Sequence, residues 1–141
     1  MIVSDTDFLS AFLKIGELEL ILEELGMEEI VVPVQVEKEL LEDLEEKINE
    51  SITVEDVDPI EDEGLGEGER AAIALATEED LVLMNDRKAC ERAAQEDLNT
   101  VTIPGFLKFL DSEETQEIAE KLREKDNYRF SEKERKEIGL T

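Results

Sequence analysis

The chain has 141 residues, of which 40% are hydrophobic, so it is long enough to form a single domain around one core. Its 40 Asp and Glu outnumber its 15 Lys and Arg, and the net charge of -25 argues against a generally basic nucleic-acid-binding surface and against attraction to anionic membranes. The absence of histidine and the single cysteine exclude a Ser-His-Asp triad, a His-ligated zinc site and an intrachain disulfide. Any bound metal would therefore be held by carboxylates, which favours a hard ion such as Mg²⁺, Mn²⁺ or Ca²⁺.

No apolar stretch approaches the roughly 18 residues that a helix needs to cross a bilayer. The first residues, 1–5, lack the cationic and long apolar regions of a signal peptide. We therefore expect a cytoplasmic protein that does not bind a membrane. The acid excess also has a simple explanation, because most Glu residues stand between the apolar residues of predicted helices, where solvent-facing charge belongs.

Short β-branched runs alternate with amphipathic stretches, which predicts an α/β fold with a parallel sheet covered by helices on both faces. Ligand sites in such sheets lie beyond the carboxyl ends of the strands. Residues 126–141 are polar, so we expect one domain at 1–125 and a polar C-terminal tail with a short helix. In chain order the pattern predicts a strand at 1–4, helices at 7–15 and 17–25, a strand at 29–32, a helix at 34–49, a strand at 51–57, a loop at 58–66, a helix at 67–78, a strand at 81–84, a helix at 87–96, a strand at 100–103, a helix opening at Pro104, and more exposed helices at 113–124 and 132–138.

Three acids, Asp5, Glu69 and Asp86, open predicted helices on the side that turns toward the core. Each is followed by apolar residues at offsets of three, four and seven, which is its own helical face. Carboxylates placed in this way at one sheet edge would repel one another unless a cation neutralised them. Helix capping is the alternative, because Asp is a favoured N-cap and an acid in the first turn interacts well with the helix dipole. Both interpretations apply to each acid alone, and the three acids together favour a divalent metal site.

Four segments of the chain resemble the successive motifs of the PIN-domain nucleases, in the order and spacing of that family. They extend from residue 1 to about residue 110. The resemblance implies a PIN-like three-layer fold, with a central, mostly parallel five-stranded sheet covered by helices. It also implies metal-dependent cleavage of RNA. The segments are IVSDTD at 2–7, PVQVEKEL at 33–40, GERAAIALA at 68–76 and LMNDR at 83–87.

The resemblance places Asp5, Glu39, Glu69 and Asp86 on the acidic positions of the family. It therefore implies that these four residues bind Mg²⁺ or Mn²⁺ and carry the catalysis. Metal held by carboxylates lowers the pKa of a bound water and acts as a Lewis acid on the phosphoryl group, which are both needed to hydrolyse a phosphodiester.

The chain departs from the family pattern beside two of these positions. Asp7 stands where Ser or Asn is usual, and Glu67 is a second acid close to Glu69 but on another face of the helix. A conflict also concerns Glu39. Helical spacing places Glu37, not Glu39, on the face of the predicted leucine stripe, whereas the motif match favours Glu39. We take Glu39 as the ligand and keep Glu37 as the alternative. The stripe is formed by Leu40, Leu41 and Leu44.

Three further residues are candidate substrate contacts. The hydroxyl of Thr6 would lie near the metal, and Arg87 and Lys88 follow Asp86 closely enough to contact phosphate. A helix cap for Thr6 and a solvated helix surface for the two cations are the alternatives.

The sequence therefore indicates a Mg²⁺-dependent ribonuclease. Many small single-domain proteins that resemble this chain are VapC-like toxins of toxin–antitoxin pairs, which implies a small antitoxin partner and a homodimer. One alternative is a non-catalytic PIN-fold protein-interaction module. The other is an acidic divalent-cation-binding protein without nuclease action, which ranks last because no Asp-rich loop of the EF-hand type is present.

Overall fold

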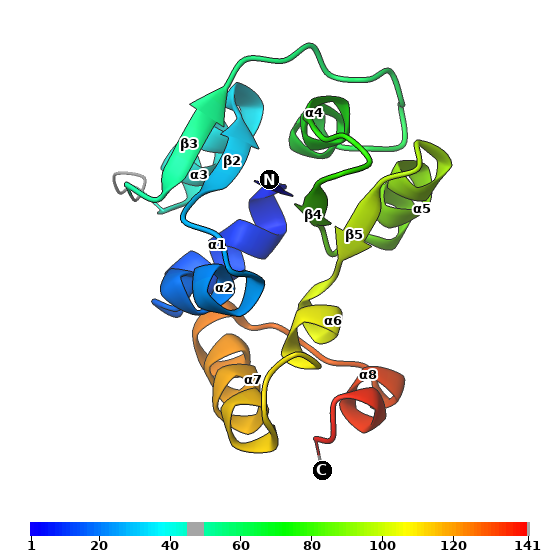
Figure 1. Cartoon of the computed structure of the whole chain (residues 1–141). Helices are drawn as coiled ribbons and strands as arrows, with labels where there is room; N and C mark the ends of the chain where they lie inside the picture. Colours follow the sequence, from blue (N-terminus) through cyan, green and yellow to red (C-terminus); the bar gives the residue numbers. More distant parts are fainter. Residues whose placement is uncertain (45–49, 141) are drawn as a thin grey trace.

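Five strands form one sheet in a computed structural model that describes residues 1–44 and 50–140 (Figure 1). The strands lie in the order β3-β2-β1-β4-β5, and each neighbouring pair is parallel. This confirms the predicted α/β fold with a central five-stranded sheet between helices. The strands are β1 (Ile2–Ser4), β2 (Ile30–Pro33), β3 (Ile52–Glu55), β4 (Leu81–Leu83) and β5 (Asn99–Val101).

Helices connect and follow these strands, close to the predicted positions. The predicted helix at 67–78 ends early, because the backbone N–H and the hydroxyl of Thr77 both donate to Asp80 and form a turn (2.8 and 3.0 Å). Residues 45–49 of the predicted helix at 34–49 lie outside the described residues. No helix in the described part of the chain is long and apolar enough to cross a membrane. The helices are α1 (Thr6–Lys14), α2 (Leu18–Leu25), α3 (Val34–Leu44), α4 (Glu67–Leu75), α5 (Arg87–Gln95), α6 (Ile103–Leu107), α7 (Ser112–Asp126) and α8 (Glu132–Glu137).

The sheet has a hydrophobic core on each face, because successive strand residues point to opposite sides. Ile2 belongs to the core that α1, α2, α3, α6 and α7 cover, whereas its neighbour Val3 belongs to the core that α4 and α5 cover. In the larger core the rings of Phe12 and Phe106 meet edge to face, with centroids 5.4 Å apart. Helices therefore cover both faces of the sheet.

The chain leaves β1 and β4 toward opposite faces of the sheet. The helix after β1 is α1 on one face, and the helix after β4 is α5 on the other. The two strands are hydrogen-bonded neighbours, with Ser4 opposite Leu83, and the N–H of Asp5 donates to the Leu83 carbonyl at 3.0 Å. A crevice forms where neighbouring strands diverge in this way, and ligands bind there in open α/β sheets.

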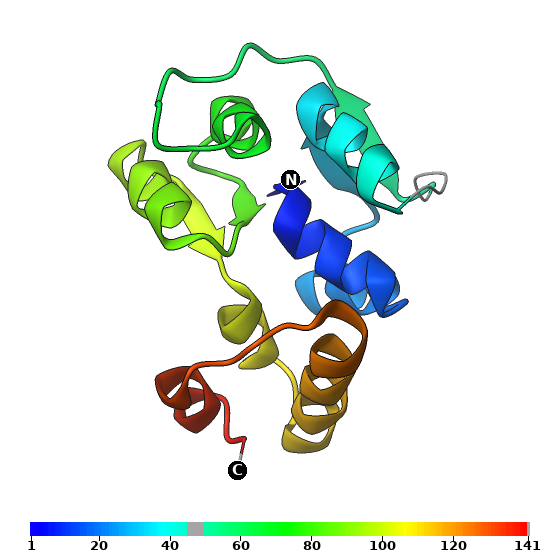
Figure 2. The same ribbon diagram turned by 180° about the vertical axis from the view of Figure 1, so that it is seen from behind.

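The C-terminal helices α7 and α8 lie together at one end of the molecule (Figures 1 and 2). Helix α7 buries Ile118 and Leu122, and the side chain of Gln116 donates to the Gly139 carbonyl beyond α8 (2.9 Å). Four residues after α7 pack against the larger core, so the last part of the chain is anchored. The division of the chain at residue 125 stays a prediction. The four are Tyr128, Phe130, Ile138 and Leu140.

Candidate active site

Asp5 lies at the carboxyl end of β1 and caps α1. Its Oδ1 atom accepts a hydrogen bond from the N–H of Phe8 at 3.0 Å. Only 1% of the residue is exposed, and its Oδ2 atom is buried without a hydrogen-bond partner in the described structure. Buried carboxylate oxygens without a partner are costly. One oxygen of Asp5 therefore serves the helix, and the other is left for a ligand.

Asp86 and Glu69 are held in the same way at the starts of two other helices. Asp86 Oδ2 accepts from the N–H of Ala89 at 3.0 Å, and Glu69 Oε1 accepts from the N–H of Gly66 at 3.0 Å. The predicted interaction with the helix starts is therefore confirmed for both acids, and the metal site stays a prediction. Figure 2 shows α1, α3, α4 and α5 grouped around this edge.

Glu39 reaches the same place from α3. Its carboxylate accepts two hydrogen bonds, from the hydroxyl of Thr6 at 2.7 Å and from the N–H of Gly68 at 3.2 Å. The two bonds join α3 to α1 and α4 and fix both oxygens of Glu39. The carboxylate lies in a cavity of about 140 Å³, which is lined by Asp5, Thr6, Asp7, Glu39, Gly66, Gly68 and Glu69.

Glu37 does not line this cavity. The helical spacing that favoured Glu37 assumed that Leu41 is buried, and this assumption was wrong. The predicted stripe included Leu41, which is 44% exposed, while Leu40 is 1% exposed. The buried line of α3 runs instead through Val36 and Leu40. With about 3.6 residues per turn, Glu37 and Glu39 flank this line on opposite sides. The flank that carries Glu39 faces α1 and α4.

Burial and neighbouring carboxylates raise the pKa values of Asp5 and Glu69. Burial raises the pKa of Asp5 well above its ordinary value, the Phe8 N–H lowers it in part, and the charges of Asp7, Glu69 and Asp86 raise it further. Burial also raises the pKa of Glu69, against the hydrogen bond from Gly66. The charges of Asp86, Asp7 and Glu39 act in the same direction on Glu69. The acids therefore form one electrostatic cluster, which a cation would relieve.

The donor atoms of this cluster fit a hard divalent ion. They are all oxygens, and one of them, Asp5 Oδ2, is buried without a partner. Among the described residues, no three acidic or cysteine side chains already converge as a ready-made metal site. One carboxylate oxygen of Glu69 and one of Asp86 accept a backbone N–H at the start of a helix. Coordination of a metal ion would therefore use the other oxygen of each residue or require a small rotation of the side chains.

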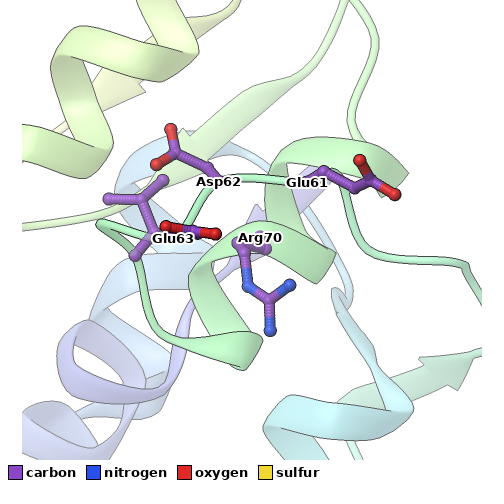
Figure 3. Close-up of a pocket in the computed structure, with 5 residues that line it drawn as sticks. Glu61, Asp62, Glu63 and Arg70 are labelled. Carbon is purple, nitrogen blue, oxygen red and sulfur yellow. The ribbon is translucent and has the colours of Figure 1, made fainter.

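The loop between β3 and α4 is fastened to α4 and α5. Arg70 donates from Nη1 to the Ile60 carbonyl at 3.5 Å, and its own carbonyl accepts from the Ile60 N–H at 3.3 Å. Asp62 pairs with Arg92 of α5 at 3.1 Å. Together these contacts set the position from which the chain enters α4. Figure 3 shows a second cavity beside this loop, of about 590 Å³, lined by Glu61, Asp62, Glu63, Leu65 and Arg70, none of which lines the cavity that holds Glu39.

The other predicted residues differ in their positions. Thr6 lies in the cavity as a donor to Glu39. Arg87 is on the surface, with a side chain that is 91% exposed and paired with Glu91 at 3.2 Å, and Lys88 is exposed beside it. Glu67 is exposed and does not line the cavity. The substrate-binding role of Thr6, Arg87 and Lys88 stays a prediction.

Two residues of this region were missed by sequence reasoning. Gly68 brings its backbone against Glu39, and a glycine inside a helix is itself a signal that a close approach is needed. Asn85 accepts from the N–H of Ile103 at 2.9 Å and donates to the hydroxyl of Tyr128 at 3.0 Å. No local sequence pattern predicts that Asn85 contacts residues as distant in the chain as Ile103 and Tyr128.

The chain is an α/β domain with several acids at the carboxyl edge of its parallel sheet. A family model described as a PIN domain matches residues 1–139, so this chain belongs to the PIN-domain family. PIN domains are generally nucleases, and they usually use divalent metal ions. No curated protein and no solved structure matches the chain.

A methyl group at position 68 is expected to displace Glu39. A Cβ atom there would lie 2.9 Å from Glu39 Oε1 and 3.0 Å from Thr6 Oγ1. Gly→Ala in a helix ordinarily stabilises by about 0.5–1 kcal/mol, and we expect Gly68→Ala to lose this gain because Glu39 must give up its hydrogen bonds. The free energy of unfolding in urea measures the effect, and Glu39→Ala in the same chain should restore the gain. An equal gain with and without Glu39 would contradict the contact.

The stability of the metal-free protein should fall as Asp5 ionises. Its pKa in the folded state lies above the value of about 3.9 in an unfolded chain. Neutral Asp5 therefore stabilises the fold at low pH, and this contribution is lost as the pH rises through the folded pKa. We expect the free energy of unfolding, measured in urea with EDTA present, to fall less with rising pH for Asp5→Asn than for the wild type.

The matched control for this series is Asp97→Asn. Asp97 is exposed, lies beyond the far end of α5 from Asp86, and has a positive φ of 60° that Asn tolerates. The free energy of unfolding of Asp97→Asn should depend on pH as that of the wild type does. Parallel profiles for the wild type and Asp5→Asn would mean that Asp5 is not the group responsible.

Proposed function

We propose that this protein is a divalent-metal-dependent ribonuclease that hydrolyses RNA phosphodiester bonds at its cluster of carboxylates. The observation that carries the proposal is the buried Oδ2 atom of Asp5, which has no hydrogen-bond partner in the described structure. The same carboxyl group experiences the charges of Asp7, Glu69 and Asp86. This grouping of carboxylates is unfavourable in the metal-free protein and would become favourable when a cation binds. PIN domains usually use divalent metal ions, and membership of that family supports the proposal that this cation serves a nuclease.

In this proposal Asp5, Glu39, Glu69 and Asp86 hold Mg²⁺ or Mn²⁺. The bound ion would supply an activated water and neutralise charge that develops on the phosphoryl oxygens. Asp5, Glu69 and Asp86 lie at the starts of α1, α4 and α5, where the positive end of each helix attracts a carboxylate. Asp5 has little freedom to move, since its Oδ1 atom is fixed to the first turn of α1.

Thr6 and Gly68 orient Glu39 from two sides. Their hydrogen bonds occupy one position at each oxygen of the carboxylate and leave its remaining lone pairs for a ligand. Groups of this kind, which hold a metal ligand without touching the metal, tune its affinity. Arg87 and Lys88 follow Asp86 directly, and we propose that they contact phosphates that flank the scissile bond.

The proposal extends to the biological setting implied by the resemblance to VapC-like toxins. In that setting the chain is the toxin of a toxin–antitoxin pair, acts on cytoplasmic RNA, forms a homodimer and is neutralised by a small antitoxin protein. The support is the set of four motifs along one small domain and the match of the PIN-domain family over the same residues.

Cleavage should depend on Glu39 and not on Glu37. Glu39→Gln is expected to reduce the initial rate of RNA cleavage by about 100-fold, because a neutral amide is a poor ligand for Mg²⁺. Glu37→Gln, two residues away on the other flank of α3, should stay within about twofold of the wild type. The assay uses a panel of single-stranded and structured RNAs with Mg²⁺ or Mn²⁺, and circular dichroism checks that both variants fold.

The opposite ranking would identify Glu37 as the ligand. Metal binding without cleavage of any RNA in the panel would favour an acidic cation-binding protein. Neither metal binding nor cleavage by the wild type would favour a non-catalytic protein-interaction module of the PIN fold.

A further inference from the structure

Positive charge is concentrated in one short part of this acidic chain. Residues 121–136 contain seven of the 15 Lys and Arg but only four of the 40 Asp and Glu. We call these residues the basic segment. Its formal charge is +3, which leaves -28 for the rest of the chain. The net charge of -25 therefore conceals a local surface of the opposite sign.

The basic segment is anchored to the folded domain. It comprises the end of α7, the connection after it and most of α8, and in Figure 2 the connection crosses below α1. Asn127 ends α7 with a positive φ of 55°. The rings of Tyr128 and Phe130 then meet edge to face, with centroids 4.7 Å apart, and pack against the larger core. The cations are therefore carried at a defined place.

A hydrogen bond connects the basic segment to the proposed active site. The hydroxyl of Tyr128 accepts from the side-chain amide of Asn85 at 3.0 Å. Asn85 is the residue before Asp86, which caps α5 and belongs to the acidic cluster. Tyr128, the residue before Arg129, therefore contacts the segment that follows β4.

Four exposed cations of this segment form no ion pair with an acid in the part of the chain that the structure describes. Lys121 pairs with Glu17 and Glu117, and Arg123 pairs with Glu120. Arg135 also has an interaction within the fold, whereas no ion pair within residues 1–44 and 50–140 involves the remaining four exposed cations. In a chain with so many acids, cations that remain unpaired are available for a partner outside the protein. They are Lys125, Arg129, Lys133 and Lys136.

We propose that the basic segment binds the phosphate backbone of the RNA substrate beside the catalytic carboxylates. This inference rests on the proposed ribonuclease function and names the surface that brings RNA to an otherwise repulsive protein. Contacts between Lys or Arg and phosphates supply most of the sequence-independent affinity for nucleic acids. A second copy of this acidic chain would also be attracted to the basic segment, but the hydrogen bond between Tyr128 and Asn85, the residue before Asp86, favours RNA as the partner.

The test replaces the four unpaired cations together by glutamine. We expect the binding of a short fluorescein-labelled single-stranded RNA to weaken, KM for its cleavage to rise about tenfold and kcat to stay unchanged. The dependence of log affinity on log KCl should become shallower by about 0.7 for each phosphate contact that is lost. As a matched pair, Arg129→Gln should show part of this effect, whereas Lys38→Gln, an exposed cation on α3, should show none.

The outcomes separate this inference from the proposed function. Cleavage and binding by the fourfold variant at wild-type levels would overturn the basic segment as the RNA surface while leaving the ribonuclease intact. A changed sedimentation coefficient with unchanged RNA affinity would also overturn it and assign the segment to a second copy. RNA binding that is lost in the variant, with no cleavage by the wild type, would support the segment and overturn the ribonuclease. A wild type that does not bind RNA would overturn both.

Discussion

The hydrogen bond from the Phe8 N–H to Asp5 is the interaction on which the rest of the site depends. It caps α1 at the point where the chain leaves the central strand β1, and it commits one carboxylate oxygen to the helix. The second oxygen is consequently buried at the carboxyl edge of the sheet without a partner. The fold supports this arrangement because β1 has neighbours on both sides and its first helix covers a large core.

Helix capping also explains how several acids can share one small region. Asp86 and Glu69 each accept a backbone N–H at the start of a helix, which offsets part of the repulsion between them. Burial, together with the remaining repulsion, raises the pKa values of Asp5 and Glu69. The negative charge at this edge of the sheet is therefore not balanced by the protein itself. Charge is also uneven along the chain, since the basic segment has a formal charge of +3 and is joined to Asn85 through Tyr128.

Sequence reasoning predicted the fold well because its signals are local. Alternating β-branched runs and amphipathic stretches predicted each described strand. Of the three acids predicted to group at the starts of helices, Asp5 and Glu69 line one cavity, and the role of all three as metal ligands stays a prediction. It was wrong where packing decides, as with Leu41, whose exposure cannot be read from helical spacing alone. It could not find the contact between Asn85 and Tyr128, because only the folded chain brings together residues 43 positions apart.

The central claim is that the acidic edge is a specific divalent metal site, and thermal unfolding with and without Mg²⁺ tests it most directly. A ligand that binds only the folded state stabilises it by RT ln(1 + [L]/Kd). We predict that Mg²⁺ raises the melting temperature of the wild type and of Asp97→Asn alike. Asp5→Asn should be more stable than the wild type without metal and should gain nothing from Mg²⁺. Equal gains in all three proteins would show that Mg²⁺ only screens the net charge, and would contradict the account.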